Sequence, residues 1–300
     1  MILITGATGT NGTEIVKLLL SRLSVPCRAL VRTPEKAGTL SGLPNVEIVQ
    51  GDFAHPETLE PALEGVDKAL LISSIAPNLP ELQGNFVRAA TRAGVPYVVK
   101  FSGAWQMGAD LRKEWRFVRW HAEAEKLVED SGLAFTHLQP NQFMQVYLRF
   151  QPTIAAQGKF YAASGDSKVS PVDVRDIAAV AVAVLTGSGH EGKWYVITGP
   201  EALSYTEIAD KLSTAIGKKV TYVDVPLETA KKALLDSGMP EWFAEGQSEQ
   251  FRVRRQGHQS AITSVVAELA RKQPISFDEF AREYAPCFRG ERTQPKVVAN

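Results

Sequence analysis

Three glycines near the amino terminus, Gly6, Gly9 and Gly12, lie where a chain can bind phosphate groups. They follow the short apolar run 1–5 and precede the stretch 14–23, whose apolar residues recur at helical spacing. At the start of a helix the backbone N–H groups lack partners and the helix dipole is positive, so a pyrophosphate is attracted there. Glycine leaves room for the phosphates and for close packing of the helix on the strand. The turn predicts a dinucleotide site, and the alternative is a tight turn that binds nothing.

The residue after the second expected strand indicates which dinucleotide binds. About 20 positions after the last glycine of such a turn, NAD-binding proteins carry an acidic residue for the ribose 2′-hydroxyl, and here that position is Arg32. Arg32, with Lys36 nearby, offers a planar fork and a point charge to a 2′-phosphate. These cations favour NADP(H) and leave NAD(H) as the alternative. The other interpretation is that both are solvated surface cations.

Four further residues follow expected strands and would reach the same edge of a parallel sheet. Asp52 and Phe53 come after the third strand and fit a corner that contacts adenine. Ser73 and Ser74 come after the fourth strand and would lie beside the ribose and the phosphates. Ligands of open parallel sheets bind outside the carboxyl ends of the strands, so we expect these residues in one site.

Proton transfer needs a different group from the pair that short-chain reductases usually employ, a tyrosine with a lysine four residues later. None of the seven tyrosines has lysine at that offset. The candidates for a proton donor are Lys100, at the end of the fifth strand, His121 and Tyr147. Lys100 could instead be a solvated lysine at the sheet edge, and His121 could simply pair with Glu125 one helical turn later.

Aromatic side chains crowd the segment after the fifth strand. They are Trp105, Trp115, Phe117 and Trp120. The plain interpretation is a hydrophobic core, and the functional one is a flat wall for a small hydrophobic or aromatic substrate.

These residues must be positioned by strands and helices that alternate along the chain. Expected strands are 1–5, 28–31, 46–49, 69–72, 97–101 and 135–138, and expected helices are 14–23, 56–63, 79–93 and 115–130. Repeated βα units with short connections predict a doubly wound α/β fold, in which helices cover both faces of a parallel sheet.

After about residue 140 glycines break the chain into shorter pieces. We expect a nucleotide-binding domain over 1–150, a mainly substrate-binding α+β domain over 151–288 and a mobile tail over 289–300. The segment 166–198 would return to the first domain, because its helix 176–185 is apolar nearly all round. Farther on, Ser204 and Glu207 have capping-box spacing for a helix over 205–216, followed by a strand over 220–225.

Composition excludes several classes of protein. The 300 residues include 33 Lys plus Arg and 33 Asp plus Glu, so no net field attracts nucleic acid or an anionic membrane. Cys27 and Cys287 form no CxxC pair, which argues against a disulfide framework and a cysteine-based zinc site and favours a reducing compartment. No apolar run approaches the ~18 residues of a membrane span, so we expect a cytoplasmic protein. We also expect no bound metal.

Several segments resemble the NmrA-like group of atypical short-chain dehydrogenases/reductases, especially its quinone- and dye-reducing members. They are TGATGTNG at 5–12, HAEAEKLVEDSGLAFTHLQPNQF at 121–143 and GHEGKWYVITGP at 189–200. The resemblance covers about residues 1 to 288 and implies a Rossmann domain that binds NADP(H), with a smaller carboxyl-terminal domain over a hydrophobic cleft. The family's cofactor positions fall on Gly6, Thr8, Gly9, Thr10, Asn11, Arg32, Asp52, Phe53, Ser73 and Ser74. Its nicotinamide neighbours fall on Phe101, Ser102, Gly103, Pro140, Asn141, Gln142 and Phe143.

Two functions from different classes are compatible with these features. The first is an NADPH-dependent reductase of a quinone-like or other conjugated molecule, since such an acceptor takes hydride with little help from an acid. The second, which the resemblance also implies, is a non-catalytic NAD(P) sensor that acts through a protein partner. The retained nicotinamide-side segments favour the reductase. The sequence does not indicate an oligomeric state.

Overall fold

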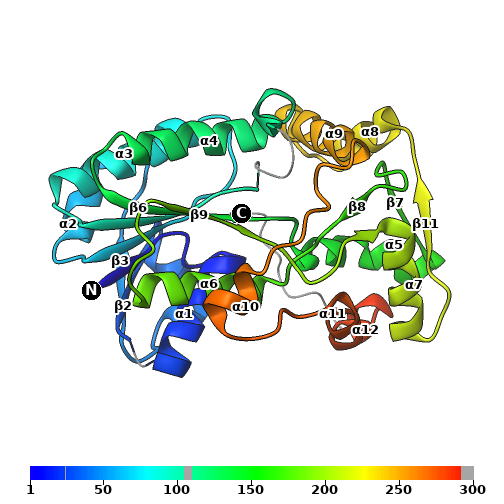
Figure 1. The fold of residues 1–300 in the computed structure, drawn as a ribbon, viewed down its shortest axis with the longest axis horizontal. Helices are drawn as coiled ribbons and strands as arrows, with labels where there is room; N and C mark the ends of the chain where they lie inside the picture. Colours follow the sequence, from blue (N-terminus) through cyan, green and yellow to red (C-terminus); the bar gives the residue numbers. More distant parts are fainter. Residues whose placement is uncertain (24, 105–109, 292–300) are drawn as a thin grey trace.

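The described chain, residues 1–23, 25–104 and 110–291 of the computed structural model, is organised around a parallel sheet of seven strands (Figure 1). The strands lie in the order β3-β2-β1-β4-β5-β6-β9, and every neighbouring pair is parallel. They span Ile2–Ile4 (β1), Cys27–Val31 (β2), Val46–Gln50 (β3), Lys68–Leu71 (β4), Tyr97–Phe101 (β5), Ala134–Pro140 (β6) and Lys193–Ile197 (β9). The order reverses between β1 and β4, which is where open sheets of this kind bind their ligands. The prediction of a doubly wound α/β fold is confirmed.

Helices cover both faces of this sheet (Figure 1). On one face lie α1 (Thr10–Leu23), α6 (Val174–Thr186) and α10 (Val265–Ala270), and on the other lie α2 (Leu59–Leu63), α3 (Leu79–Arg92) and α4 (Arg116–Glu129). Helix α6 is apolar nearly all round because it is buried between α1, α10 and the sheet, with Ile177 and Val184 inside the main hydrophobic cluster. The helices on the two faces of the sheet hold the loops at its carboxyl edge from both sides.

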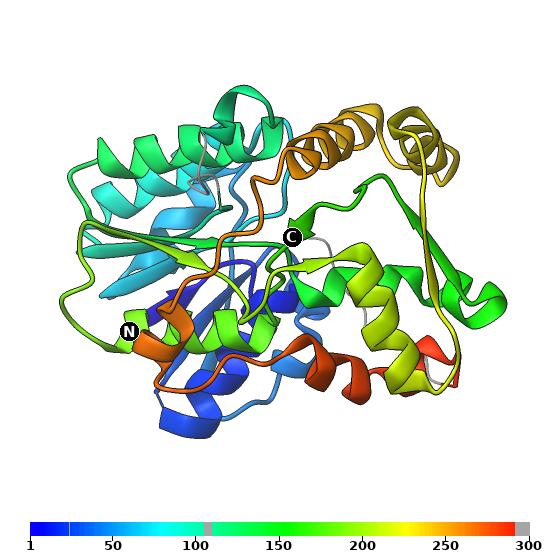
Figure 2. The same cartoon turned by 45° about the vertical axis from the view of Figure 1, so that its right-hand side comes forward.

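A smaller lobe extends from the carboxyl edge of the sheet (Figure 2). Its strand pairs are β7 (Lys159–Ala162) with β11 (Thr221–Asp224), and β8 (Lys168–Val169) with β10 (Leu203–Ser204). Its helices are α5 (Gln151–Gln157), α7 (Tyr205–Ile216), α8 (Leu227–Asp236), α9 (Glu241–Arg255), α11 (Phe277–Glu283) and α12 (Ala285–Phe288). In the described chain as a whole, short 3₁₀ segments run over Pro34–Lys36, Gly38–Leu40, Pro56–Thr58, Leu111–Lys113 and Met144–Phe150. A separate cluster of buried aromatic rings, including Tyr147, Tyr205 and Phe277, forms the core of the smaller lobe.

Individual elements differ in how well the sequence predicted them. Strand 97–101 and helix 205–216 have the predicted limits, and the capping box between Ser204 and Glu207 is present. Helix α1 begins at Thr10 rather than at residue 14, because its first turn is built from the polar end of the glycine motif. Strand β9 and helices α8 and α9 were not predicted.

The described part of the chain contains no helix with the length and hydropathy needed to cross a membrane. Of the tail predicted at 289–300, residues 292–300 lie outside the described residues. The domain boundaries at 150 and 288 stay predictions.

Candidate active site

The glycine turn connects the end of β1 to the start of α1. Gly6 has a φ of +58°, a left-handed conformation that glycine adopts without strain. A Cβ at Gly12 would lie 2.2 Å from the carbonyl oxygen of Gly6, so the first turn of α1 can pack on the glycine turn only without a side chain there. The Gly9 N–H donates to the Gly6 carbonyl at 2.9 Å and closes the turn.

Asn11 supplies the most informative polar group of this turn. Its side chain is 1% exposed, and neither its amide nitrogen nor its amide oxygen has a hydrogen-bond partner among the described residues. A buried amide without partners costs about 1–3 kcal/mol, so such a group at a phosphate-type turn fits a polar ligand. Thr8 is exposed and Thr10 is half-buried beside it.

The edge loops after β1 and β4 are joined by a threonine. Thr5 Oγ1 donates to the Ile72 carbonyl and accepts from the Ile72 N–H, both at 2.7 Å. Ser73 follows directly, and its hydroxyl accepts from Gln83 Nε2 at 2.9 Å, while Ser74 is exposed. Gln83 lies buried on α3 and was missed by sequence reasoning, although a polar residue on the buried face of a helix was a usable signal.

The corner predicted to contact adenine is held in a similar way. Asn85 Nδ2, also on α3, donates to the Phe53 carbonyl at 2.8 Å. Asp52 Oδ1 accepts from the Ala54 N–H at 3.0 Å and shapes the turn after β3. Two amides of one helix therefore fix two loops at the carboxyl edge of the sheet.

Arg32 extends from the end of β2 and is exposed. Its backbone carbonyl accepts from Gln50 Nε2 at 3.3 Å, but its guanidinium forms no ion pair with any residue that the structure describes. The side chain of Lys36 lies outside the described part. An arginine whose guanidinium has no ion pair in the described part of the chain is available to a phosphate.

The segments predicted beside the nicotinamide lie next to each other at the ends of β5 and β6. The Ser102 N–H donates to the Leu138 carbonyl at 2.7 Å, and the rings of Phe101 and Phe143 meet edge to face at 6.3 Å between centroids. A Cβ at Gly103 would lie 3.5 Å from the ring of His121, so the loop passes close to α4. The carbonyl of Pro140 accepts from the Ala104 N–H at 3.1 Å.

Asn141 and Gln142 attach this edge to the smaller lobe. Asn141 Nδ2 donates to Ser170 Oγ at 2.8 Å and to the Gln259 carbonyl at 2.9 Å, so its buried amide is occupied by the protein itself. Gln142 Oε1 accepts a hydrogen bond from Arg254 of α9. Arg254 was not predicted, because only the folded chain brings residue 254 to residue 142.

Lys100 and His121 are brought together by the fold. Lys100 is 0% exposed, so the alternative of a solvated lysine is wrong. Its Nζ lies 3.3 Å from Nδ1 of His121. Burial lowers the pKa of Lys100 to about 8, partly offset by the charge of Glu125. Burial, together with the Lys100 charge, holds the pKa of His121 well below its usual range, so the imidazole is neutral near pH 7.

Tyr147 belongs to a different cluster from Lys100 and His121. It packs in the core of the smaller lobe, with ring centroids 5.6 Å from Tyr205 and 5.3 Å from Phe277. Its hydroxyl is buried without a hydrogen-bond partner among the described residues, and burial raises its pKa well above the usual range. Of the three candidate donors, only Lys100 and His121 lie together.

The aromatic wall involves both lobes. Phe117 of α4 stacks near Trp120 and Phe243, with centroids 5.7 Å apart in each pair. A Cβ at Gly246 would lie 2.3 Å from the Phe117 ring, so α9 packs closely against α4, and the two helices lie side by side at one end in Figures 1 and 2. Trp120 and Phe243 are half-buried, and Trp105 lies outside the described residues.

The described residues contain one group with metal-ligand spacing. Ligand atoms of Glu125, Glu129 and His137 lie within 4.8 Å of one another. His137 Nε2 lies 3.2 Å from Glu129 Oε1, and Gln139 Nε2 donates to Glu125 at 2.9 Å. The contact between His137 and Glu129 and the hydrogen bond from Gln139 to Glu125 account for the compactness of the group, and we assign no metal to it.

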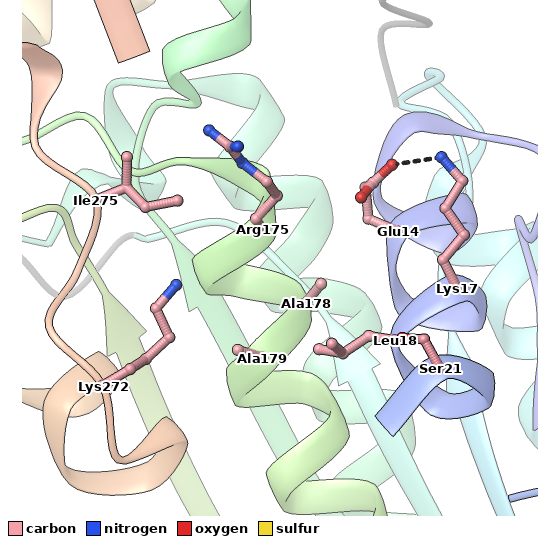
Figure 3. Close-up of a pocket in the computed structure, with 9 residues that line it drawn as sticks. All are labelled: Glu14, Lys17, Leu18, Ser21, Arg175, Ala178, Ala179, Lys272 and Ile275. Atoms are coloured by element: carbon pink, nitrogen blue, oxygen red, sulfur yellow. Dashed lines mark hydrogen bonds and ion pairs between the residues drawn. The ribbon is translucent and has the colours of Figure 1, made fainter. Parts of the chain in front are cut away.

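A hollow of about 250 Å³ between α1 and α6 lies elsewhere (Figure 3). None of the residues that line it is a predicted site residue. The cations that line it are paired, Lys17 with Glu14 at 2.9 Å, Arg175 with Asp173 at 2.8 Å and Lys272 with Asp176, so it offers no uncompensated positive charge to a ligand.

The parallel sheet, with its order reversed between β1 and β4 and a glycine turn at its carboxyl edge, defines a Rossmann-type dinucleotide-binding fold. The model of the NmrA-like family matches residues 1–281, and the chain belongs to this family.

Two relatives cover most of the chain. NAD(P)H azoreductase from Xenophilus azovorans is 39% identical over 288 residues, which are 96% of this chain and 99% of the relative. Quinone oxidoreductase 2 from Escherichia coli is 34% identical over 250 residues, which are 82% of this chain and 85% of the relative.

Solved structures give the same picture. The NADPH complex of an NADPH-dependent quinone oxidoreductase from Escherichia coli has a TM-score of 0.87 at 29% identity and covers 94% of this chain and 99% of its own. The NADP(H) complex of triphenylmethane reductase from Citrobacter sp. has a TM-score of 0.84 at 28% identity, covering 95% and 100%. The negative transcriptional regulator NmrA, at 17% identity and a TM-score of 0.77, shares the fold.

Proposed function

We propose that this protein is an NADPH-dependent reductase that transfers hydride to a quinone-like or other conjugated small molecule. The observation that carries the proposal is the buried amide of Asn11 in the glycine turn, which has no hydrogen-bond partner among the described residues. An amide buried in this way needs a polar ligand for its hydrogen bonds. In addition, relatives that cover nearly the whole chain are NAD(P)H- and NADPH-dependent reductases.

The residues present fit NADP(H). The turn between Gly6 and Gly12 offers a helix N-terminus where glycines leave room for phosphates, and Arg32 offers a 2′-phosphate a cation that forms no ion pair with any described residue. Ser73 and Phe53 lie in loops that Gln83 and Asn85 hold in place. NADPH, when bound, supplies the hydride. The protein's own part is to orient the cofactor and the acceptor and to move a proton.

The acceptor we propose is planar and conjugated. The half-buried rings of Trp120 on α4 and Phe243 on α9 belong to one apolar cluster and suit a flat apolar molecule. A quinone or an azo compound delocalises the arriving charge, which makes strong acid catalysis less necessary than for a simple ketone. The cytoplasmic location is part of the same proposal, since Cys27 and Cys287 are buried free thiols.

The sensor alternative is less well supported. The regulator NmrA shares the fold at 17% identity, whereas the azoreductase and the quinone oxidoreductase are 39% and 34% identical.

The test measures NADPH oxidation by the purified chain with a panel of quinones, azo dyes and simple ketones. We expect turnover with the quinones and dyes and almost none with the ketones. Asn11→Leu should weaken NADPH binding in a fluorescence titration and leave the circular dichroism spectrum native. Tight NADPH binding by the wild-type chain with no turnover of any acceptor would refute the reductase and favour the sensor.

A further inference from the structure

Lys100 is surrounded by groups that accept hydrogen bonds from an ammonium. Its Nζ lies 3.2 Å from Ser102 Oγ, 3.3 Å from the Phe101 carbonyl oxygen and 3.3 Å from His121 Nδ1. An ammonium has three N–H donors, and each finds one acceptor here. The pocket is therefore built around the protonated form of Lys100.

Keeping this charge inside the protein is unfavourable. A fully buried ammonium loses its hydration, and the hydrogen bonds of Lys100 within the described chain go to no carboxylate. The groups that face it are His121 and Glu125 on α4 and His137, its cross-strand neighbour on β6. With a pKa of about 8, the ammonium can release its proton near neutral pH.

Ser102 connects this charge to the candidate site. Its Oγ accepts from Lys100, so its own proton points elsewhere, and it finds no acceptor among the described residues. The residue is 3% exposed and follows β5 directly, at the edge where the nicotinamide-side segments meet. A hydroxyl with a charged donor behind it and a free proton in front suits proton transfer to a ligand.

We propose that Ser102, Lys100 and His121 form a relay that protonates the reduced acceptor, with Ser102 as the catalytic residue that contacts it. The relay rests on the proposed function. His121 is a positioning residue, because its Nδ1 accepts from Lys100 and fixes the direction of the remaining N–H groups. This arrangement takes over the task for which the chain lacks a Tyr/Lys pair.

The relay conserves atoms and electrons. A quinone gains two electrons and one hydrogen as hydride from NADPH, which leaves NADP⁺ and a hydroquinone anion. Ser102 gives its proton to the anionic oxygen while Lys100 gives a proton to Ser102, so the products are a neutral hydroquinone and a neutral Lys100 amine. Water then reprotonates the amine.

The test compares two acceptors in single turnover. A quinone needs a proton after hydride arrives, whereas a cationic triphenylmethane dye becomes neutral on hydride addition and needs none. We expect Ser102→Ala and Lys100→Met to slow quinone reduction by up to about 10²-fold, the low end of general acid catalysis because a quinone delocalises the arriving charge, and dye reduction far less. Ser102→Thr, which keeps the hydroxyl, should retain most of the quinone rate.

The pH profile gives a second readout that a structural role would not move. The wild-type quinone rate should fall as pH rises through about 8, because Lys100 loses its proton there, and this fall should vanish in Lys100→Met. Lys126→Met is the matched control, since that lysine is exposed on α4 and pairs with Asp130 at 2.8 Å.

Two outcomes would overturn the relay: equal slowing of quinone and dye in both variants, or a pH-dependent fall that persists in Lys100→Met. Failure of the wild-type chain to reduce either acceptor would refute the proposed function instead. NADPH titration and circular dichroism of each variant separate loss of folding from loss of proton transfer.

Discussion

Two buried cations, one in each lobe, lie in different surroundings. Lys100 in the main sheet is 0% exposed, and Arg254 of α9 is 1% exposed. Arg254 donates to Gln259 Oε1 at 2.9 Å, to the Tyr205 hydroxyl at 2.6 Å and to Gln142, and no carboxylate pairs with it in the described chain. A guanidinium keeps its proton under all ordinary conditions, whereas an amine shifts its pKa on burial. Equal burial therefore suits Lys100 to the proton transfer that we propose and leaves Arg254 with its hydrogen bonds alone.

Substitution of Arg254 should have the largest effect on stability. Arg254→Met removes the donor that several buried polar groups share, and each group left without a partner costs about 1–3 kcal/mol. We expect the free energy of unfolding to fall by about 3–5 kcal/mol, measured by urea denaturation. Arg254→Lys should recover little, because a single ammonium cannot reproduce the planar fork. An Arg254→Met variant as stable as wild type would contradict the structural role of this arginine.

Substitution of Lys100 should change the stability in the opposite direction. Burial lowers its pKa from 10.5 to about 8, so between these pH values the unfolded chain binds more protons than the folded one. Stability of the wild type then rises with pH across this window, and below pH 8 the buried charge destabilises the fold by on the order of 3 kcal/mol. Lys100→Met should be more stable than wild type at pH 7, with a difference that shrinks toward pH 10.5. Urea denaturation at several pH values measures this, and a difference independent of pH would contradict the assignment.

The contrast between these regions also shows what the sequence could predict. Local patterns were enough for β5, for the capping box at Ser204 and for the glycine turn, because each depends on neighbours in the chain. Lys100 was recognised as a candidate from its place at a strand end, but its burial and its contact with His121 depend on the packing of α4 over β5.

The carboxyl-terminal half of the chain was predicted less well for a physical reason. Strand β9 joins a sheet whose other strands lie at least 53 residues earlier, between Ile2 and Pro140, so its pairing has no local signal. Helix α8 contains no buried residue, which leaves its apolar pattern weak. Arg254 stands in a charged sequence typical of a solvated helix, and only the distant Gln142, Ser164 and Tyr205 make it a core residue.

Arg32 is an exposed cation that can be compared with the two buried ones. Its substitution should have the smallest effect of the three. Its guanidinium forms no ion pair with any described residue, and the hydrogen bond to its backbone carbonyl survives substitution, so loss of the side chain should cost the fold nothing measurable. Its charge-assisted contact with a 2′-phosphate should be worth about 1.5 kcal/mol after screening by solvent, which corresponds to about tenfold in affinity. Arg32→Ala should therefore weaken NADPH binding about tenfold and leave NADH binding and the unfolding curve nearly unchanged, while Arg119→Ala on α4 serves as the exposed control. Titration of both cofactors checks this, and an unchanged ratio of the two dissociation constants would show that the 2′-phosphate is recognised by another group.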